Sequence, residues 1–392
     1  MDKSYSRLII KLYAYSFFDD FILIYPLYAV MFADAHLTPS RISILFIVWS
    51  LTAFLLEIPA GSLADKYPRK NILLLGILLR VIGYGFWLFS KTFTSFLIGF
   101  IFWGIKGAFS SGTEEALVYD ELNRIGQPTL YAKVMGRIEA YALLGVVVAG
   151  VGASALARHG YGLVLILSIA SVLISGLAVY LLPTAKAVKA SEEAKYLEYF
   201  KEGISEVFKK SIILYLIIFM SVVAGLGAID EYFTLFFRQK GFTNSSLALW
   251  FAFIYGLGAL GSIVAHRFEN KKLPANFFLF VWATLLWLAA ISPKLVVPIL
   301  LGLYLMFFFG AQVLFNSYLQ KHLNDKTRAT ATSVGGFTAE LFAILSFAVV
   351  GFGANHSGYI YSFKLIAGCL VMFGLILYLY SRRANLTFSG QQ

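Results

Sequence analysis

The stretch Gly61-Ser62-Leu63-Ala64-Asp65-Lys66-Tyr67-Pro68-Arg69-Lys70 separates two long apolar runs of the chain. The run before it covers 40–63 and the run after it covers 71–90, and a membrane-spanning helix needs about 20 predominantly apolar residues. Lys66, Arg69 and Lys70 are typical of a loop on the cytoplasmic side of a membrane. The stretch is therefore expected to end one transmembrane helix and to lead through a short basic loop into the next.

The composition of the whole chain agrees with this interpretation. Of its 392 residues, 59% are hydrophobic and 14% are charged, and the mean hydropathy is +0.77. Soluble domains carry roughly 25% charged residues, so a water-soluble enzyme and a disordered chain are both excluded. The single cysteine, Cys369, excludes an intrachain disulfide and a cysteine-based metal site.

Twelve apolar stretches follow one another along the chain, which predicts an all-α integral membrane protein with twelve transmembrane helices. Their expected limits are 8–33, 40–63, 71–90, 94–118, 132–157, 161–182, 211–237, 244–266, 274–291, 295–319, 331–353 and 358–380. The polar segment 183–210 mixes Lys with Glu and is expected to be a cytoplasmic linker with an amphipathic helix. It divides the chain into two six-helix bundles, 1–182 and 211–392.

The two predicted bundles share short sequence similarities. Gly61-Ser62 ends the second apolar stretch and Gly261-Ser262 ends the eighth, at an offset of 200 residues. Gly136 and Gly335 open the fifth and eleventh stretches, at an offset of 199 residues. Similarity between two six-helix halves indicates a duplication, which is a known plan of transporters.

The positions of the basic residues predict the topology. If the N-terminus is cytoplasmic, 23 of the 32 Lys and Arg residues lie in cytoplasmic segments and seven lie on the outer side. This bias satisfies the positive-inside rule. It predicts a multi-pass protein of the cell membrane with both termini in the cytoplasm. The net charge of +11 is then explained without nucleic acid.

The stretch 61–70 resembles a family signature. It is similar to the motif G-x-L-a-D-r-x-G-R-[RK] between spans 2 and 3 of the major facilitator superfamily, with Pro68 in place of the second glycine. With twelve spans in two sets of six, the resemblance covers the whole chain. It implies a monomeric secondary transporter that works by alternating access on a small-molecule substrate in the lipid bilayer, and not an enzyme.

The same resemblance implies a gating role for five residues. Gly61 is expected to allow two helices to approach closely, and Asp65 to lie against the N-terminus of the eleventh span, near Thr330. Arg69 is expected to pair with Asp120. Lys70 completes the basic end of the motif.

Two further family signatures are only partly kept. In span 5, Gly136 and Gly145 have the antiporter spacing, but Ala149-Gly150 replaces a Gly-Pro pair. In span 4, Trp103 and Lys106 stand where proton antiporters often carry Arg and Gln. This pattern favours an antiporter that lacks the usual arginine of the proton relay.

Charged residues within the spans are costly and usually face a partner or a wet cavity. The acids expected to couple protons are Asp19, Asp20, Glu114, Glu115 and Glu340. The residues expected to form ion pairs or line the cavity are Arg80, Lys106, Trp103, Asp230, Glu231, Gln312 and Asn316. Neighbouring helical residues lie about 100° apart, so one of Asp19 and Asp20 is expected to face the cavity and the other a partner such as Arg80.

These residues predict proton-coupled export of a small amphipathic compound by antiport. Acids outnumber bases within the first six spans, and burial favours the protonated carboxyl group. No GxxxxGK[ST] pattern is present, and the five histidines show no metal-ligand spacing, so no cofactor or metal is expected and the proton gradient is the expected energy source. Proton-coupled import of a small solute and translocation of a lipid or lysolipid remain alternatives. A sensor or scaffold that has lost transport would need a large soluble domain.

Overall fold

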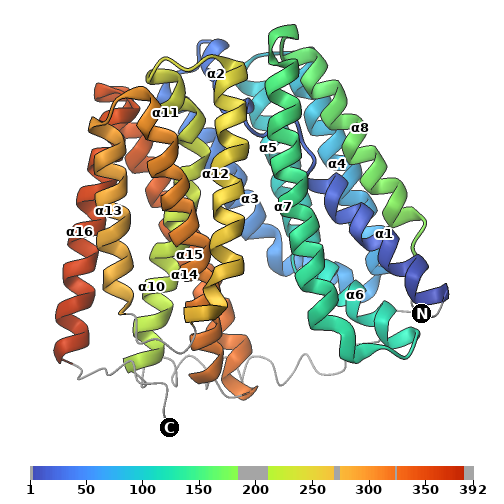
Figure 1. The fold of residues 1–392 in the computed structure, drawn as a ribbon. Helices are drawn as coiled ribbons and strands as arrows, with labels where there is room; N and C mark the ends of the chain where they lie inside the picture. Colours follow the sequence, from blue (N-terminus) through green and yellow to red (C-terminus); the bar gives the residue numbers. More distant parts are fainter. Residues whose placement is uncertain (1–2, 184–210, 269–273, 323–324, 384–392) are drawn as a thin grey trace. The chain divides into compact units, whose positions relative to one another are not determined.

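The computed structural model describes residues 3–183, 211–268, 274–322 and 325–383, and these residues form helices without any strand. Ten helical segments of this part of the chain are long and apolar enough to cross a membrane. The shorter apolar helix α13 (Ala275–Ile291) and an interrupted first segment complete the twelve predicted crossings. The fold class predicted from the sequence is thus confirmed (Figure 1).

The chain divides into two compact units, Met1–Ala190 with Phe242–Ala252, and Ser191–Gly241 with Phe253–Gln392. The helices of the first half are α1 (Lys3–Asp20), α2 (Tyr28–Asp34), α3 (Pro39–Lys66), α4 (Arg69–Phe89), α5 (Phe93–Ser110), α6 (Thr113–Arg124), α7 (Tyr131–Leu156) and α8 (Tyr161–Tyr180). The other helices, besides α13, are α10 (Ser211–Gly227), α11 (Phe233–Gln239), α12 (Asn244–Ala265), α14 (Val297–His322), α15 (Asp325–Ser357) and α16 (Tyr359–Arg383). The predicted amphipathic helix of the linker 183–210 falls outside the described residues.

The two halves repeat the same helix pairings. In the first, α1 packs on α7 and α8, and α4 packs on α5 and α8. In the second, the corresponding spans pair in the same way, because α10 packs on α15 and α16, and α13 packs on α14 and α16. This correspondence supports the duplication that the two glycine matches indicated.

Three predicted spans are interrupted in the structure, so the expectation of one continuous helix over 8–33 is wrong. The first span ends as helix at Asp20 and resumes at Tyr28, and Pro26 in the gap cannot donate a backbone hydrogen bond. The seventh span passes through a 3-10 turn, η3 (Ala228–Tyr232), between α10 and α11. The fourth turns at Gly112, whose φ of 68° suits glycine, before α6 begins.

Side chains from neighbouring helices satisfy the backbone groups that the first interruption frees. Ser171 donates to the carbonyl oxygen of Phe18 at 2.7 Å, and the Ile24 N–H donates to Ser168 Oγ at 3.0 Å. Both serines lie on α8. In a membrane an unsatisfied backbone group costs several kcal/mol, so irregular backbone occurs only where protein or a wet cavity surrounds it.

The interruption of the seventh span is supported by tyrosines. The buried Tyr304 of α14 donates to the Leu226 carbonyl oxygen at 3.1 Å. Tyr232, within η3, donates to the Phe347 carbonyl oxygen at 3.4 Å. The two halves therefore stabilise corresponding interruptions with different hydroxyl groups.

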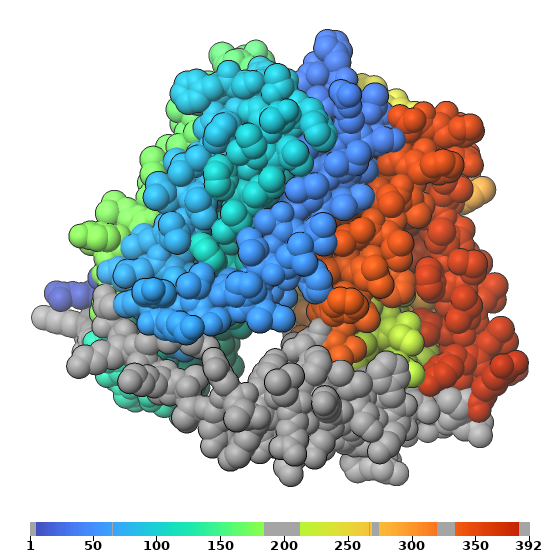
Figure 2. Space-filling model, turned by 180° about the vertical axis from the view of Figure 1, so that it is seen from behind, coloured from blue at the N-terminus to red at the C-terminus, as the bar shows by residue number. Residues whose placement is uncertain are grey.

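Apolar side chains are exposed on the outer surface of several helices. In Figure 2, α3 (blue) and α5 (cyan) lie next to each other on the surface of the first unit. Leu55 and Ile58 of α3 are 60% and 85% exposed. Exposed apolar surface of this kind is expected where lipid covers the protein.

Gly145 of α7 lies directly against the interrupted first span. A Cβ atom at this position would be 2.5 Å from the Phe17 carbonyl oxygen, so the backbone would have to move. At Gly136 of the same helix, by contrast, a Cβ would meet nothing within 4 Å. The two glycines of the span 5 signature thus have different structural roles.

We expect Gly145→Ala to lower the free energy of unfolding by about 1–3 kcal/mol, because overpacking forces the backbone apart. Gly136→Ala is the matched control and should be neutral or stabilising by up to about 1 kcal/mol, since alanine favours a helix. Thermal unfolding of the purified protein in detergent measures both. Equal melting temperatures for the two variants would contradict the close contact.

Candidate functional site

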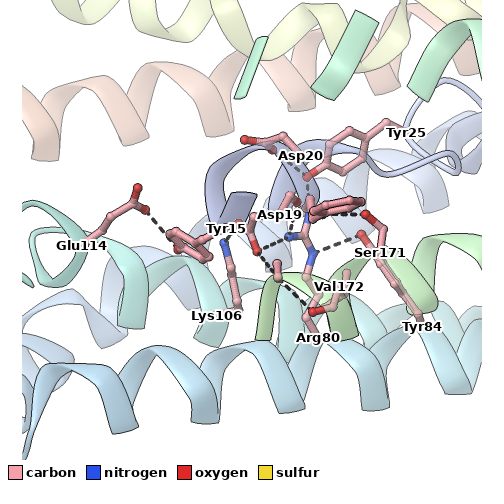
Figure 3. A network of polar contacts seen from close by, with 12 residues as sticks. Tyr15, Asp19, Asp20, Tyr25, Arg80, Tyr84, Lys106, Glu114, Ser171 and Val172 are labelled. Carbon is pink, nitrogen blue, oxygen red and sulfur yellow. Dashed lines mark hydrogen bonds and ion pairs between the residues drawn. The ribbon is translucent and has the colours of Figure 1, made fainter. Parts of the chain in front are cut away.

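A network of charged and aromatic side chains lies at the interruption of the first span (Figure 3). Its centre is Asp19, the penultimate residue of α1, which is only 7% exposed. Lys106 of α5 places Nζ 2.6 Å from Asp19 Oδ2, and Arg80 of α4 places Nη1 3.4 Å from Oδ1. Ser175 of α8 donates to Oδ1 at 3.4 Å. One carboxylate thus binds groups from three helices.

Arg80 is enclosed by aromatic rings. Its guanidinium carbon lies 5.1 Å from the ring centre of Trp103 and 5.6 Å from those of Tyr25 and Tyr84, which are cation–π contacts. It also donates to the Asp19 carbonyl oxygen at 3.0 Å, to Tyr84 Oη at 3.2 Å and to Tyr25 Oη. Because the residue is 1% exposed, its charge is held by the protein and is not open to a solute.

Asp20 has different side-chain partners from Asp19. Its Oδ1 accepts a hydrogen bond from Tyr25 Oη at 3.3 Å, and Tyr25 accepts one from Arg80. No ion pair to Asp20 occurs in the described part of the chain. The pairing of Arg80 with Asp19 confirms the prediction that one of the two aspartates would meet this base.

The acids after the fourth span are separated by their positions on α6. Glu114 accepts a hydrogen bond at 3.1 Å from Tyr15, a buried residue one turn before Asp19 on α1. Glu115 is exposed. Both lie in the first turn of α6, where a helix dipole favours carboxylates. Of the two, Glu114 is connected to the face of α1 that carries Asp19.

In the second unit, Asp230 and Glu231 lie on η3, at the interruption of the seventh span. Tyr255 of α12 donates to Asp230 Oδ2 at 2.5 Å. Glu340 is partly buried on α15 and interacts with other parts of the protein. On α14, Gln312 is partly buried and Asn316 is exposed.

The loop motif forms one of its expected contacts. Arg69 pairs with Asp120 of α6, as predicted. Lys70 donates to the Leu182 carbonyl oxygen at 2.8 Å, just after the end of α8. A Cβ at Gly61 would meet nothing within 4 Å among the described residues, and the close helix approach predicted for Gly61 stays a prediction. The side chain of Asp65 and those near Thr330 lie outside what the structure describes.

Sequence reasoning missed the residues that hold the network together. Neither the motifs nor the charged positions of the sequence predict a role for Tyr15, Tyr25 and Tyr84 or for the serines of α8. Ser168, Ser171 and Ser175 follow a helical spacing within a strongly apolar segment, which places them on one face. That spacing was the available signal.

Comparisons with known proteins agree on one family. The family model described as Major Facilitator Superfamily matches residues 12–347. Among solved structures, the nucleoside transporter NupG is 16% identical with a TM-score of 0.75, covering 95% of this chain and 98% of that chain. No curated protein sequence matched the chain.

Two further solved structures share the fold. A bacterial homolog of the human lysosomal transporter Spinster is 16% identical with a TM-score of 0.76, covering 97% of this chain and 98% of that chain. A D-xylose-proton symporter is 14% identical with a TM-score of 0.75, covering 96% and 97%. At these identities the three structures establish the fold alone.

We expect Asp19→Asn and Lys106→Met each to lower the melting temperature, because removing one member of a buried pair leaves a charge uncompensated at a cost of about 3–5 kcal/mol. The double variant should lose less than the sum of the two single losses. Thermal unfolding of the four proteins measures this coupling.

The control cycle pairs Lys106→Met with Glu57→Gln, a change at an exposed position of α3. These two losses should add. Additive losses in the Asp19–Lys106 cycle would mean that the ion pair contributes nothing to stability.

Proposed function

We propose that the chain, which belongs to the Major Facilitator Superfamily, exports a small amphipathic compound in exchange for protons. As a transporter of this family it moves a small solute by alternating access. The proton gradient would drive this transport without a cofactor. The protein would act as a monomer in the cell membrane with both termini in the cytoplasm.

The proposal rests on the difference between the side-chain partners of Asp19 and those of Asp20. Asp19 binds both bases of the network, Lys106 and Arg80, whereas the one side-chain partner of Asp20 among the described residues is the hydroxyl group of Tyr25. A carboxylate held by two cations has little reason to take up a proton. Asp20 is therefore the acid of this pair that we assign to proton exchange.

The charges of the network allow Asp20 to exist in both forms. Arg80 and Lys106 carry two positive charges and Asp19 carries one negative charge, so an ionised Asp20 makes the four groups neutral. Burial favours the protonated form. The positive charges of the bases thus favour an ionised Asp20, and burial favours a protonated one. A change in hydration between the two states of the transport cycle would therefore add a proton to Asp20 or remove it.

Glu114 is the second acid that we assign to the proton route. Its hydrogen bond to Tyr15 joins it to α1 one turn before Asp19. Intramembrane acids of transporters commonly form such relays with neighbouring polar side chains. Glu115, which is exposed and forms no ion pair in the described residues, is given no part in the route.

Two features support export of an amphipathic compound over import. Gly145, a remaining glycine of the antiporter signature, packs against the interrupted α1. Aromatic rings also gather around the network, with Trp103 and Tyr25 stacked at 5.5 Å between ring centres. Aromatic and apolar surfaces bind bulky apolar solutes, with a few polar groups to orient them.

We expect Asp20→Asn to abolish proton-driven transport, because an amide cannot exchange a proton. Purified protein is reconstituted into liposomes, and a panel of amphipathic compounds is tested with imposed pH gradients. An antiporter accumulates substrate in vesicles with an acid lumen, whereas a symporter does so when the outside is acid. Accumulation only with an acid exterior would therefore replace export by import.

Two variants make this experiment specific. Glu139→Gln alters an exposed acid of α7 and should leave transport unchanged. Asp20→Glu keeps a titratable group and should retain part of the activity. If Asp20→Asn transports with an unchanged response to the pH gradient, the assignment of Asp20 is wrong.

A further inference from the structure

Basic residues gather at one end of the second unit, where the sequence places no acid. They are Arg238 and Lys240 at and after the end of α11, Lys294 between α13 and α14, and Lys364 near the start of α16. The segments that meet at this end contain no Asp or Glu over 232–250, 288–300 and 350–366. Membrane proteins concentrate their bases on the cytoplasmic side, so an unbalanced set of bases on the predicted outer side is unusual.

Aromatic packing brings two of these lysines towards each other. The helix α16 packs on both α11 and α13 (Figure 1). Phe236 of α11 stacks on Phe363 of α16 with 4.4 Å between ring centres, and Lys240 Nζ lies 5.7 Å from the ring centre of Phe236. Burial and the nearby ammonium group of Lys364 lower the pKa of Lys240. The two positive charges are therefore close enough to repel each other.

No anion of the described structure compensates this pair of charges. Lys240 donates to the carbonyl oxygens of Ala290 and Ser292 at 2.9 Å each, which satisfies donors but leaves the charge in place. Within the described residues Lys364 forms neither a hydrogen bond nor an ion pair. Its Nζ lies 5.7 Å from the ring centre of Trp287 on α13. The site thus offers ammonium groups that an external anion would neutralise.

The surface next to these ammonium groups is apolar and open. Trp287 is 48% exposed, and Ile291, one turn later on α13, is 58% exposed. Val371 and Leu375 lie on the same face of α16 as Lys364 and are 41% and 50% exposed. Tryptophan is enriched where a membrane meets water, and a lysine stem can lie along apolar surface with its ammonium group at that boundary. A lipid here would have its head group beside the lysines and its acyl chains along α13 and α16.

We propose that Lys240 and Lys364 bind the phosphate group of an anionic phospholipid, with Trp287 beside its glycerol region. A phosphodiester accepts charge-assisted hydrogen bonds from ammonium groups. Phosphatidylglycerol has a net negative charge that offsets the two lysines, whereas the choline of phosphatidylcholine already neutralises its own phosphate. Basic pockets between transmembrane helices bind anionic head groups in the same way. This lipid site goes beyond the proposed transport function and does not depend on it.

Native mass spectrometry of the purified full-length protein in detergent measures the affinities for phosphatidylglycerol and phosphatidylcholine with identical acyl chains. We expect phosphatidylglycerol to bind saturably and more tightly than phosphatidylcholine. Lys364→Gln should weaken its binding by about fivefold, the contribution of one lysine near an anionic lipid surface. Lys364→Arg keeps the charge and should retain most of the affinity.

Lys91→Gln is the matched control. The Lys91 ammonium group lies 5.6 Å from the ring centre of Tyr161, as Lys364 lies over Trp287, but Tyr161 also donates to the carboxylate of Asp34 at 2.5 Å. The variant therefore removes the same charge from a lysine that has an acid nearby. Its affinity for phosphatidylglycerol should equal that of the wild type.

Fluorescence locates the bound lipid, because bromine atoms on an acyl chain quench a nearby tryptophan. In vesicles of brominated phosphatidylglycerol, the wild type should be quenched more than Lys364→Gln. This difference should disappear when both proteins also carry Trp287→Phe. Quenching that is the same with and without the Lys364 ammonium group would place the lipid elsewhere and overturn the inference.

Three further results would overturn the lipid site. They are equal affinities for the two lipids, unchanged phosphatidylglycerol affinity in Lys364→Gln that melting temperatures show to be folded, and an equal loss of affinity in Lys91→Gln. Inorganic phosphate tests the other source of the same chemical group. It should not displace phosphatidylglycerol at millimolar concentration, and displacement would assign the lysines to a soluble anion instead.

Discussion

The ion pair between Asp19 and two bases is the interaction on which the first unit depends. It lies where α1 ends inside the apolar region, so it must compensate both a charge and an interrupted backbone. Lys106 and Arg80 come from α5 and α4, and Ser175 comes from α8. Removing Lys106 or Arg80 would leave buried charge uncompensated, and loss of Arg80 would also free the Asp19 carbonyl group; each of these is costly in a membrane.

The duplicated plan of the molecule makes the difference between the two acid pairs informative. The halves repeat their helix pairings and both interrupt their first span. Only the first interruption has gained internal bases, however, since Arg80 and Lys106 have no counterpart in α13 or in the middle of α14. The first unit therefore holds its own cations, and the second leaves carboxyl groups without any in the described structure.

Hydropathy predicted the number of spans, because it depends on average composition over about 20 residues, and the motif at 61–70 together with that number predicted the family. They could not show where a helix stops within an apolar run. The end of the helix within the first apolar run could be predicted only by combining three features. These are Pro26, the adjacent acids at 19–20 and the spacing of the serines of α8. The resemblance of the loop motif correctly predicted the pair Arg69–Asp120, since complementary charges at helix ends depend little on the detailed packing. The role predicted for Gly61 depends on the distance between two helices, which a motif alone does not contain, and it stays a prediction.

The assignment of the proton to Asp20 places a condition on exchange. Exchange requires that the proton and the transported compound each favour a different state of the transport cycle. Binding linkage is reciprocal, so the compound would have to weaken proton binding at Asp20 by the same factor as the proton weakens binding of the compound. Asp20→Asn should therefore make the affinity for the compound less dependent on pH.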